Sequence, residues 1–177
     1  MAKNTTSTAN GYSPGDWIVH DAYGIGQIIA IEHKSIGNKE ATYYRIDTDD
    51  STLWVPLGGE SLLRLLAPPE EFAEATAVLK RPSRQMSANY RSRLARIRRA
   101  QASGTPQALA RIVRDLWARQ QRQGKLSKTE NQALREMSSQ LLAEWSVSMK
   151  MDENRAREKF YTLLRQHALT VAVPRQI

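Results

Sequence analysis

The side chains with the clearest chemical capacity in this sequence are arginines and lysines, and they are concentrated in one stretch. Between Lys80 and Lys128 the sequence carries fourteen basic residues and one acidic residue, Asp115. Most of the fourteen are arginines, whose guanidinium groups donate two parallel hydrogen bonds to a phosphate and are weakly hydrated. A solvated surface usually mixes charges of both signs. The stretch therefore predicts a folded surface that contacts a polyphosphate such as a nucleic acid.

Five of these arginines flank an expected helical stripe formed by Tyr90, Leu94 and Ile97. Contact with the nucleic-acid backbone or minor groove fits such a helix better than recognition of base edges does. Tyr90, at the helix start, could act as a wedge against an unstacked base, although a core tyrosine at a helix end is equally consistent with its spacing. The expected nucleic-acid contacts are Tyr90, Arg91, Arg93, Arg96, Arg98, Arg99 and Lys128. Arg111, Arg114 and Arg122 are expected to lie off the apolar stripe of the next helix.

Catalytic chemistry is not indicated elsewhere. The sequence has no cysteine, which excludes disulfides, thiolate zinc sites and thiol nucleophiles. Its three histidines are scattered, and Gly24-Ile25-Gly26, which we expect to form a turn, is only part of a dinucleotide-binding motif. No apolar run approaches the roughly 20 residues of a membrane span. We predict a binding protein without enzymatic activity, cofactor or small-molecule substrate, in the cytoplasm, nucleoid-associated and not membrane-bound.

The elements that must position these groups differ between the two halves. Short β-branched and aromatic segments predict strands at 17–20, 27–32, 42–47 and 52–55, with a possible fifth at 62–66. Close spacing of the strands predicts a small, Tudor/SH3-like β-barrel. After Pro68-Pro69 the apolar period changes from two to 3.6 residues, which predicts a helical bundle. The expected fold is thus α+β, a β-barrel followed by an all-α unit.

Five helices are expected in the second half. One begins at Pro69 and one is capped by Ser87. The third carries a regular stripe that includes Leu109, Val113 and Leu116, and ends at Gly124. Ser127-x-x-Glu130 predicts a capping box for the fourth, and Asp152 opens the fifth.

The domain organisation follows from these patterns and from the charge. We expect a disordered tail at 1–11, a β domain at 12–67, a helical domain at 68–168 and a C-terminal tail at 169–177. Residues 1–69 have a net charge of −3, from five basic and eight acidic residues, whereas residues 70–177 carry +11. The two parts are therefore expected to contact different partners, with the chain as a monomer.

Several motifs together resemble the CarD/CdnL family of bacterial transcription regulators, from about Pro14 to His167. In the first half they are Pro14–His20, Tyr23–Gly26 and Leu53–Pro56, and in the second half Asn89-Tyr90, Ile112–Trp117 and Leu126–Glu130. The first half also resembles the RNA-polymerase-interacting module of the transcription-repair coupling factor.

This resemblance implies a Tudor-like barrel that docks on the RNA polymerase β subunit. It also implies a helical domain that contacts promoter DNA at the upstream edge of the transcription bubble and stabilises the open complex. Tyr90 stands where the family usually has a tryptophan wedge. The implied polymerase contacts are Lys34, Ile36, Arg45 and Trp54, although Trp54 could instead belong to the core.

Two other binding functions remain open from the sequence. Small barrels that begin with Gly-Asp also occur in KOW-type modules, so an RNA- or ribosome-associated protein is one alternative. A nucleoid-type, sequence-non-specific DNA binder is the other.

Overall fold

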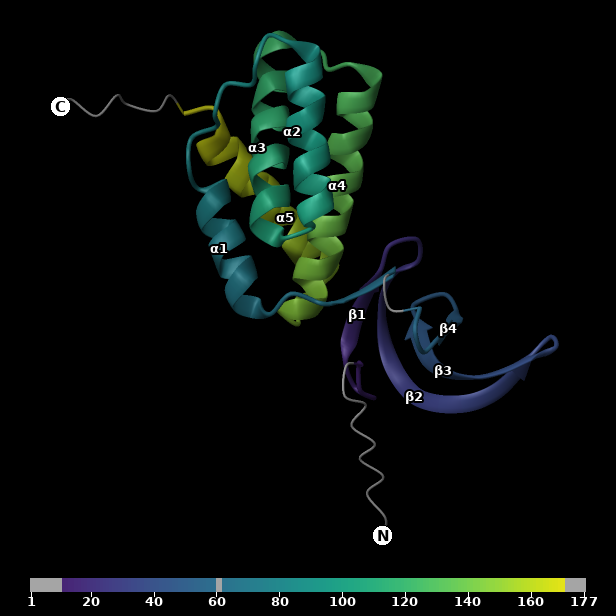
Figure 1. The fold of residues 1–177 in the computed structure, drawn as a ribbon. Helices are drawn as coiled ribbons and strands as arrows, with labels where there is room; N and C mark the ends of the chain where they lie inside the picture. Colours follow the sequence, from purple (N-terminus) through teal and green to yellow (C-terminus); the bar gives the residue numbers. More distant parts are fainter. Residues whose placement is uncertain (1–10, 60–61, 171–177) are drawn as a thin grey trace. The chain divides into compact units, whose positions relative to one another are not determined.

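The computed structural model describes residues 11–59 and 62–170, and the chain divides into two compact units, 1–66 and 67–177 (Figure 1). Each unit is described by itself. The tails expected at 1–11 and 169–177 lie outside the described residues, except for Gly11, Leu169 and Thr170.

The first unit is a five-stranded antiparallel sheet in the order β4-β3-β2-β1-β5. Long strands β2 and β3 are visibly curved (Figure 1). The strands are β1 (Trp17–His20), β2 (Gly24–Ile36), β3 (Lys39–Thr48), β4 (Thr52–Pro56) and β5 (Leu63–Leu65). A five-stranded sheet followed by helices confirms the predicted fold class.

One face of the sheet forms the apolar core of this unit. Ile18, Ile28, Tyr44 and Ile46 are fully buried, and Tyr44 and Ile46 stand two positions apart, as the two-residue period of a strand requires for residues on one face. Tyr12 closes one side of the core. Its hydroxyl donates to the carbonyl of Leu63 at 2.9 Å, and its ring meets that of Tyr44 edge-on.

The prediction of a turn at Gly24–Gly26 is wrong. The turn occupies residues 21–23, and all three residues of the motif lie in β2, where Gly26 pairs with Ile18 on one side and Thr48 on the other. Glycine is needed at position 26 for steric reasons. A Cβ atom there would lie 2.6 Å from Cγ2 of Ile46 and 2.9 Å from the carbonyl oxygen of Asp47. The motif therefore permits close approach of two strands.

Over residues 67–170, the second unit contains five α-helices, and the last continues into a short π-helical turn. They are α1 (Pro69–Leu79), α2 (Tyr90–Ser103), α3 (Pro106–Gln123), α4 (Lys128–Ser148), α5 (Glu153–Leu163) and η2 (Leu164–Ala168). Helices α2, α3 and α4 lie side by side (Figure 1). Helix α3 also contacts α1 and η2, so it is the central helix of the unit.

The helix ends follow their local sequence. The capping box at Ser127 and Glu130 and the cap at Asp152 are confirmed, and Gly124 ends α3 with a φ of 74°. The expected cap at Ser87 is wrong. Helix α2 is capped by Asn89, whose side chain accepts a hydrogen bond from the N–H of Ser92 at 3.1 Å, while the hydroxyl of Ser87 accepts one from the N–H of Asn89. Tyr90 is therefore the first residue of the helix.

Candidate nucleic-acid interface

The outer face of the sheet brings together three of the four residues expected to contact polymerase. The ammonium group of Lys34 lies 3.5 Å from the ring centroid of Trp54. Arg45 pairs in register with Trp54 and forms a salt bridge with Glu32 at 2.8 Å. Trp54 is half-buried and does not belong to the apolar core cluster of the sheet. Ile36 ends β2, and its side chain lies outside the described part of the structure.

The start of α2 presents an aromatic ring among basic side chains. Tyr90 is 41% exposed, and Arg91, Arg98 and Arg99 on the same helix are exposed as well. Lys128, at the start of α4, is also exposed. No acidic residue lies in the first turn of α2. A phosphate near this end would therefore meet no carboxylate there and would be favoured by the helix dipole.

Arg93 does not lie at the surface with its neighbours. It is only 7% exposed, and its Nε donates a hydrogen bond to Oε1 of Glu130 at 2.6 Å. Its Nη1 donates to the carbonyls of Ser87 and Ala88 at 2.9 and 2.7 Å. The expectation of an exposed phosphate contact at Arg93 therefore needs correction: a buried carboxylate draws the guanidinium inside, where it ties the segment before Tyr90 to the start of α4.

A second buried carboxylate engages two more arginines. Asp115 is 1% exposed and forms salt bridges with Arg96 and Arg114. Arg114 is itself buried, which corrects the expectation that it lies off the apolar stripe, and its Nη1 also donates to the carbonyl of Val78 at 3.0 Å. Arg96 is partly exposed, but its guanidinium group is held in the salt bridge with Asp115.

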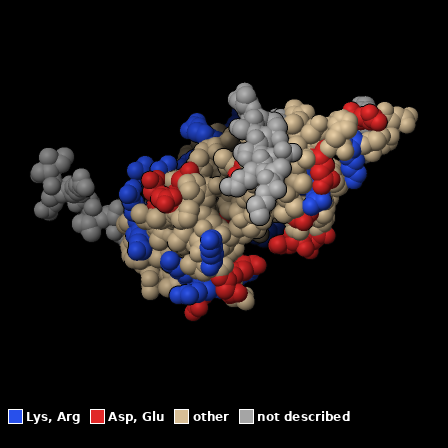
Figure 2. All heavy atoms as spheres, turned by 90° about the horizontal axis from the view of Figure 1, so that it is seen from below, with Lys and Arg blue, Asp and Glu red and all other residues tan. Residues whose placement is uncertain are grey.

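The burial of Asp115 changes the character of the surface. Since it is the only acid between Lys80 and Lys128, every exposed charge in that stretch is basic. Figure 2 shows that Asp and Glu are interspersed with Lys and Arg on the face that it draws.

Glu130 stays charged inside the unit because several donors hold it. Burial raises the pKa of its carboxyl group, but hydrogen bonds from the Arg93 side chain and from the N–H and hydroxyl of Ser127, with the positive charge of Arg93, outweigh burial. The net effect is a pKa below the ordinary value of 4.5. Glu130 thus serves both as the partner of Arg93 and as the capping-box acid of α4.

This shift predicts how stability depends on pH. Because the pKa of Glu130 is lower in the folded than in the unfolded chain, its contribution to stability is complete above about pH 4.5 and is lost as the pH falls through the folded-state pKa. We expect the melting temperature of the wild-type chain to fall more steeply below pH 4.5 than that of a Glu130→Met variant. Thermal unfolding followed by circular dichroism between pH 3 and pH 7 measures this, and parallel curves would contradict it.

The described residues indicate neither a metal site nor a membrane-spanning helix. Within 11–59 and 62–170, no group of three His, Asp or Glu side chains could hold a metal ion, and no helix is long and apolar enough to cross a membrane. His20 is buried, with its Nδ1 accepting a hydrogen bond from the N–H of Ala22 at 3.0 Å.

Comparison with family models matches both units. Residues 12–66 match the CarD-like/TRCF RID domain, and residues 74–161 match the CarD C-terminal domain. A polymerase-interacting sheet unit followed by this helical unit defines a non-enzymatic transcription regulator that binds RNA polymerase through its first domain. The chain belongs to the CarD family.

Proposed function

We propose that the protein stabilises the open promoter complex by holding the β subunit of RNA polymerase with its sheet unit and contacting DNA at the upstream edge of the bubble with its helical unit. The observation that carries this proposal is the exposed ring of Tyr90 at the first position of a helix whose exposed charges are all basic. The family match indicates that the first unit binds RNA polymerase, and its RID domain implies that the β subunit is the partner.

On the polymerase side, the contact would involve the outer sheet face, with Lys34, Arg45 and Trp54. On the DNA side, Arg91, Arg98, Arg99 and Lys128 would meet phosphates, which positions the protein without reading sequence. The ring of Tyr90 would stack at the junction between paired and melted DNA. Tethering to polymerase raises the effective concentration of a weak DNA-binding unit, so no base-specific contact is needed.

The energetic principle is differential binding. A contact made with the open complex and not with the closed one shifts the equilibrium between them, and a tenfold preference corresponds to about 1.4 kcal/mol. We further propose that the protein acts as a monomer in the cytoplasm, in association with the nucleoid.

A series of substitutions at Tyr90 tests the wedge. Because stacking of a base on an aromatic ring contributes roughly 1–3 kcal/mol, we expect Tyr90→Ala to shorten the lifetime of the open complex by about fivefold or more. Tyr90→Phe, the matched control that keeps the ring, is expected to stay near wild type, and Tyr90→Trp to lengthen the lifetime. The measurement is open-complex decay after competitor challenge, with polymerase binding and melting temperature recorded for each variant.

Equal lifetimes for Tyr90→Ala and wild type would refute the wedge. Two further measurements distinguish the other functions that the sequence left open. Tighter binding of single-stranded RNA than of forked duplex DNA would favour a KOW-like function. Function that survives removal of the sheet unit would favour a nucleoid-type DNA binder.

A further inference from the structure

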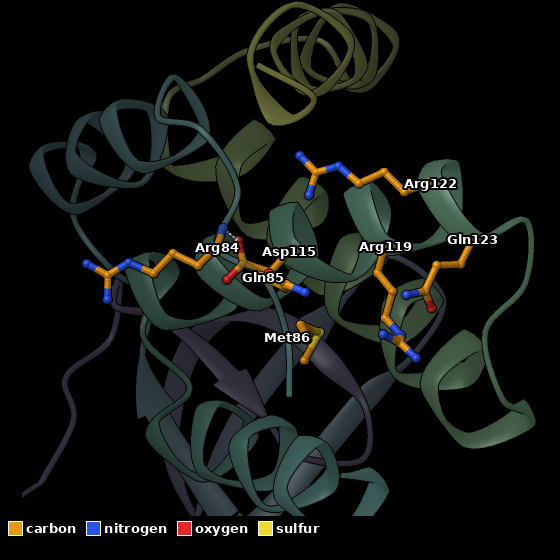
Figure 3. Close-up of a pocket in the computed structure, with 7 residues that line it drawn as sticks. All are labelled: Arg84, Gln85, Met86, Asp115, Arg119, Arg122 and Gln123. Atoms are coloured by element: carbon orange, nitrogen blue, oxygen red, sulfur yellow. Dashed lines mark hydrogen bonds between the residues drawn. The ribbon is translucent and has the colours of Figure 1, made fainter. Parts of the chain in front are cut away.

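A pocket of about 280 Å³ opens on the helical unit. It lies between α3 and the segment that joins α1 to α2 (Figure 3). Arg119, Arg122 and Gln123 line it from the last turns of α3, and Arg84, Gln85 and Met86 line it from the joining segment. Its volume is slightly below the range for small-ligand pockets, roughly 300–1,000 Å³, so it fits a ligand of few atoms.

The one carboxylate in its lining is already satisfied. Oδ1 of Asp115 accepts hydrogen bonds from the backbone N–H of Arg84 and from Nε of Arg114, both at 2.9 Å. Oδ2 accepts a hydrogen bond from Nη2 of Arg96. The first of these bonds is drawn in Figure 3. Asp115 therefore has little capacity left to neutralise the arginines around the pocket.

Two of the three lining guanidinium groups lack a carboxylate partner: among the described residues, Arg84 and Arg122 form no salt bridge. Arg119 forms a long salt bridge with Glu130, at 3.9 Å between its Nε and Oε1 of Glu130, and this Nε is buried without a hydrogen bond. A buried N–H donor without an acceptor is costly, and an anionic oxygen in the pocket would satisfy it. The pocket thus combines an excess of positive charge with an unused donor.

We propose that this pocket binds phosphate groups. Guanidinium forks match phosphate oxygens, and the side-chain amides of Gln85 and Gln123 add neutral donors at the rim. Figure 3 shows the side chains of Arg84, Arg119 and Arg122 directed to different sides. Arg84 and Arg122 are exposed, so their guanidinium groups can turn toward the pocket when a phosphate binds. A pyrophosphate unit or two successive phosphates of a nucleic-acid strand offers enough oxygens for more than one of these groups.

The two possible sources of phosphate differ in whether they depend on the proposed function. Only residues 87–89 separate the pocket-lining segment from Tyr90 along the chain, so a DNA strand held at the start of α2 would have its backbone within reach of the pocket. That source rests on the proposed function. A free phosphorylated small molecule does not, because its binding requires neither DNA nor polymerase.

The first measurement uses inorganic pyrophosphate and the full chain at constant ionic strength. We expect pyrophosphate to raise the melting temperature of the wild-type protein, and an Arg84→Gln/Arg122→Gln variant to bind at least tenfold more weakly. Both arginines are exposed, so the fold is expected to persist, and Arg119 is kept because of its position near Glu130. The matched control is Arg135→Gln/Arg155→Gln, which removes two exposed arginines outside the pocket.

The second measurement is the salt dependence of binding to a forked DNA duplex by the same three proteins. A slope of log K against log salt that falls by roughly 0.9 per lost contact in the pocket variant alone assigns the site to the DNA backbone. A pyrophosphate effect lost only in the pocket variant, with equal DNA slopes, assigns it to a free phosphorylated ligand. If the pocket and control variants behave alike in both measurements, the proposal is overturned, whereas wild-type DNA binding and the Tyr90 result still decide the proposed function.

Discussion

Replacing Glu130 by methionine is expected to lower the free energy of unfolding of the helical unit by about 3–5 kcal/mol, the cost of leaving a buried charge without its partner. The carboxylate is 1% exposed and binds Arg93 at 2.6 Å, and Arg93 is itself only 7% exposed. Methionine has a similar volume, so the loss would come from the charge and the cap and not from a cavity.

Chemical denaturation monitored by far-UV circular dichroism measures this effect. Glu136→Met is the control on the same helix, because Glu136 is exposed and its contact with Gln132 contributes little. We also expect Arg93→Met/Glu130→Met to be more stable than the sum of the single losses predicts, since apolar residues often replace a buried ion pair well. A Glu130→Met variant as stable as Glu136→Met would show that the pair does not hold the unit together.

The second large effect is expected in the sheet unit, where Gly26→Val should cost about 3 kcal/mol or more. The new Cβ atom would meet Cγ2 of Ile46 at 2.6 Å and the backbone oxygen of Asp47 at 2.9 Å, so a side-chain rotation cannot relieve the overlap. The two strands would have to separate, which breaks the pairing of β2 with β3 and disturbs the outer face that carries Trp54 and Arg45.

Tryptophan fluorescence and binding to RNA polymerase report this change, because Trp17 and Trp54 both lie in the sheet unit. We expect lost or strongly weakened polymerase binding. Ser35→Val is the control, since it places the same side chain at an exposed position of the same strand. Wild-type stability and binding for Gly26→Val would mean that the strands tolerate the separation.

The local features of the fold were largely predictable from the sequence. The stripe of Leu109, Val113 and Leu116 correctly indicated a helix, and the capping box at Ser127 fixed the start of α4. These signals are contained within a few residues. The turn expected at Gly24–Gly26 failed because glycine marks both turns and close strand contacts, and only the neighbouring strand distinguishes the two.

The candidate site was less predictable, because residues distant in sequence determine whether each arginine is buried or exposed. Arg93 lies three residues after Tyr90, so it stands on the same stripe as Leu94 and Ile97, and this spacing was a signal of burial. Its partner Glu130 is 37 positions away, and no local pattern links them. Arg114 is buried because α3 is central in the unit, which its own periodicity does not reveal.

The ammonium group resting on the ring of Trp54 has a further consequence for recognition. A lysine stacked on an indole shields an apolar surface from water while remaining charged. An acidic side chain on an approaching protein that attracts Lys34 would also draw it off the ring and uncover that surface. Attraction at long range and burial of the indole at short range would then occur in sequence, which favours a partner that offers both a carboxylate and an apolar neighbour.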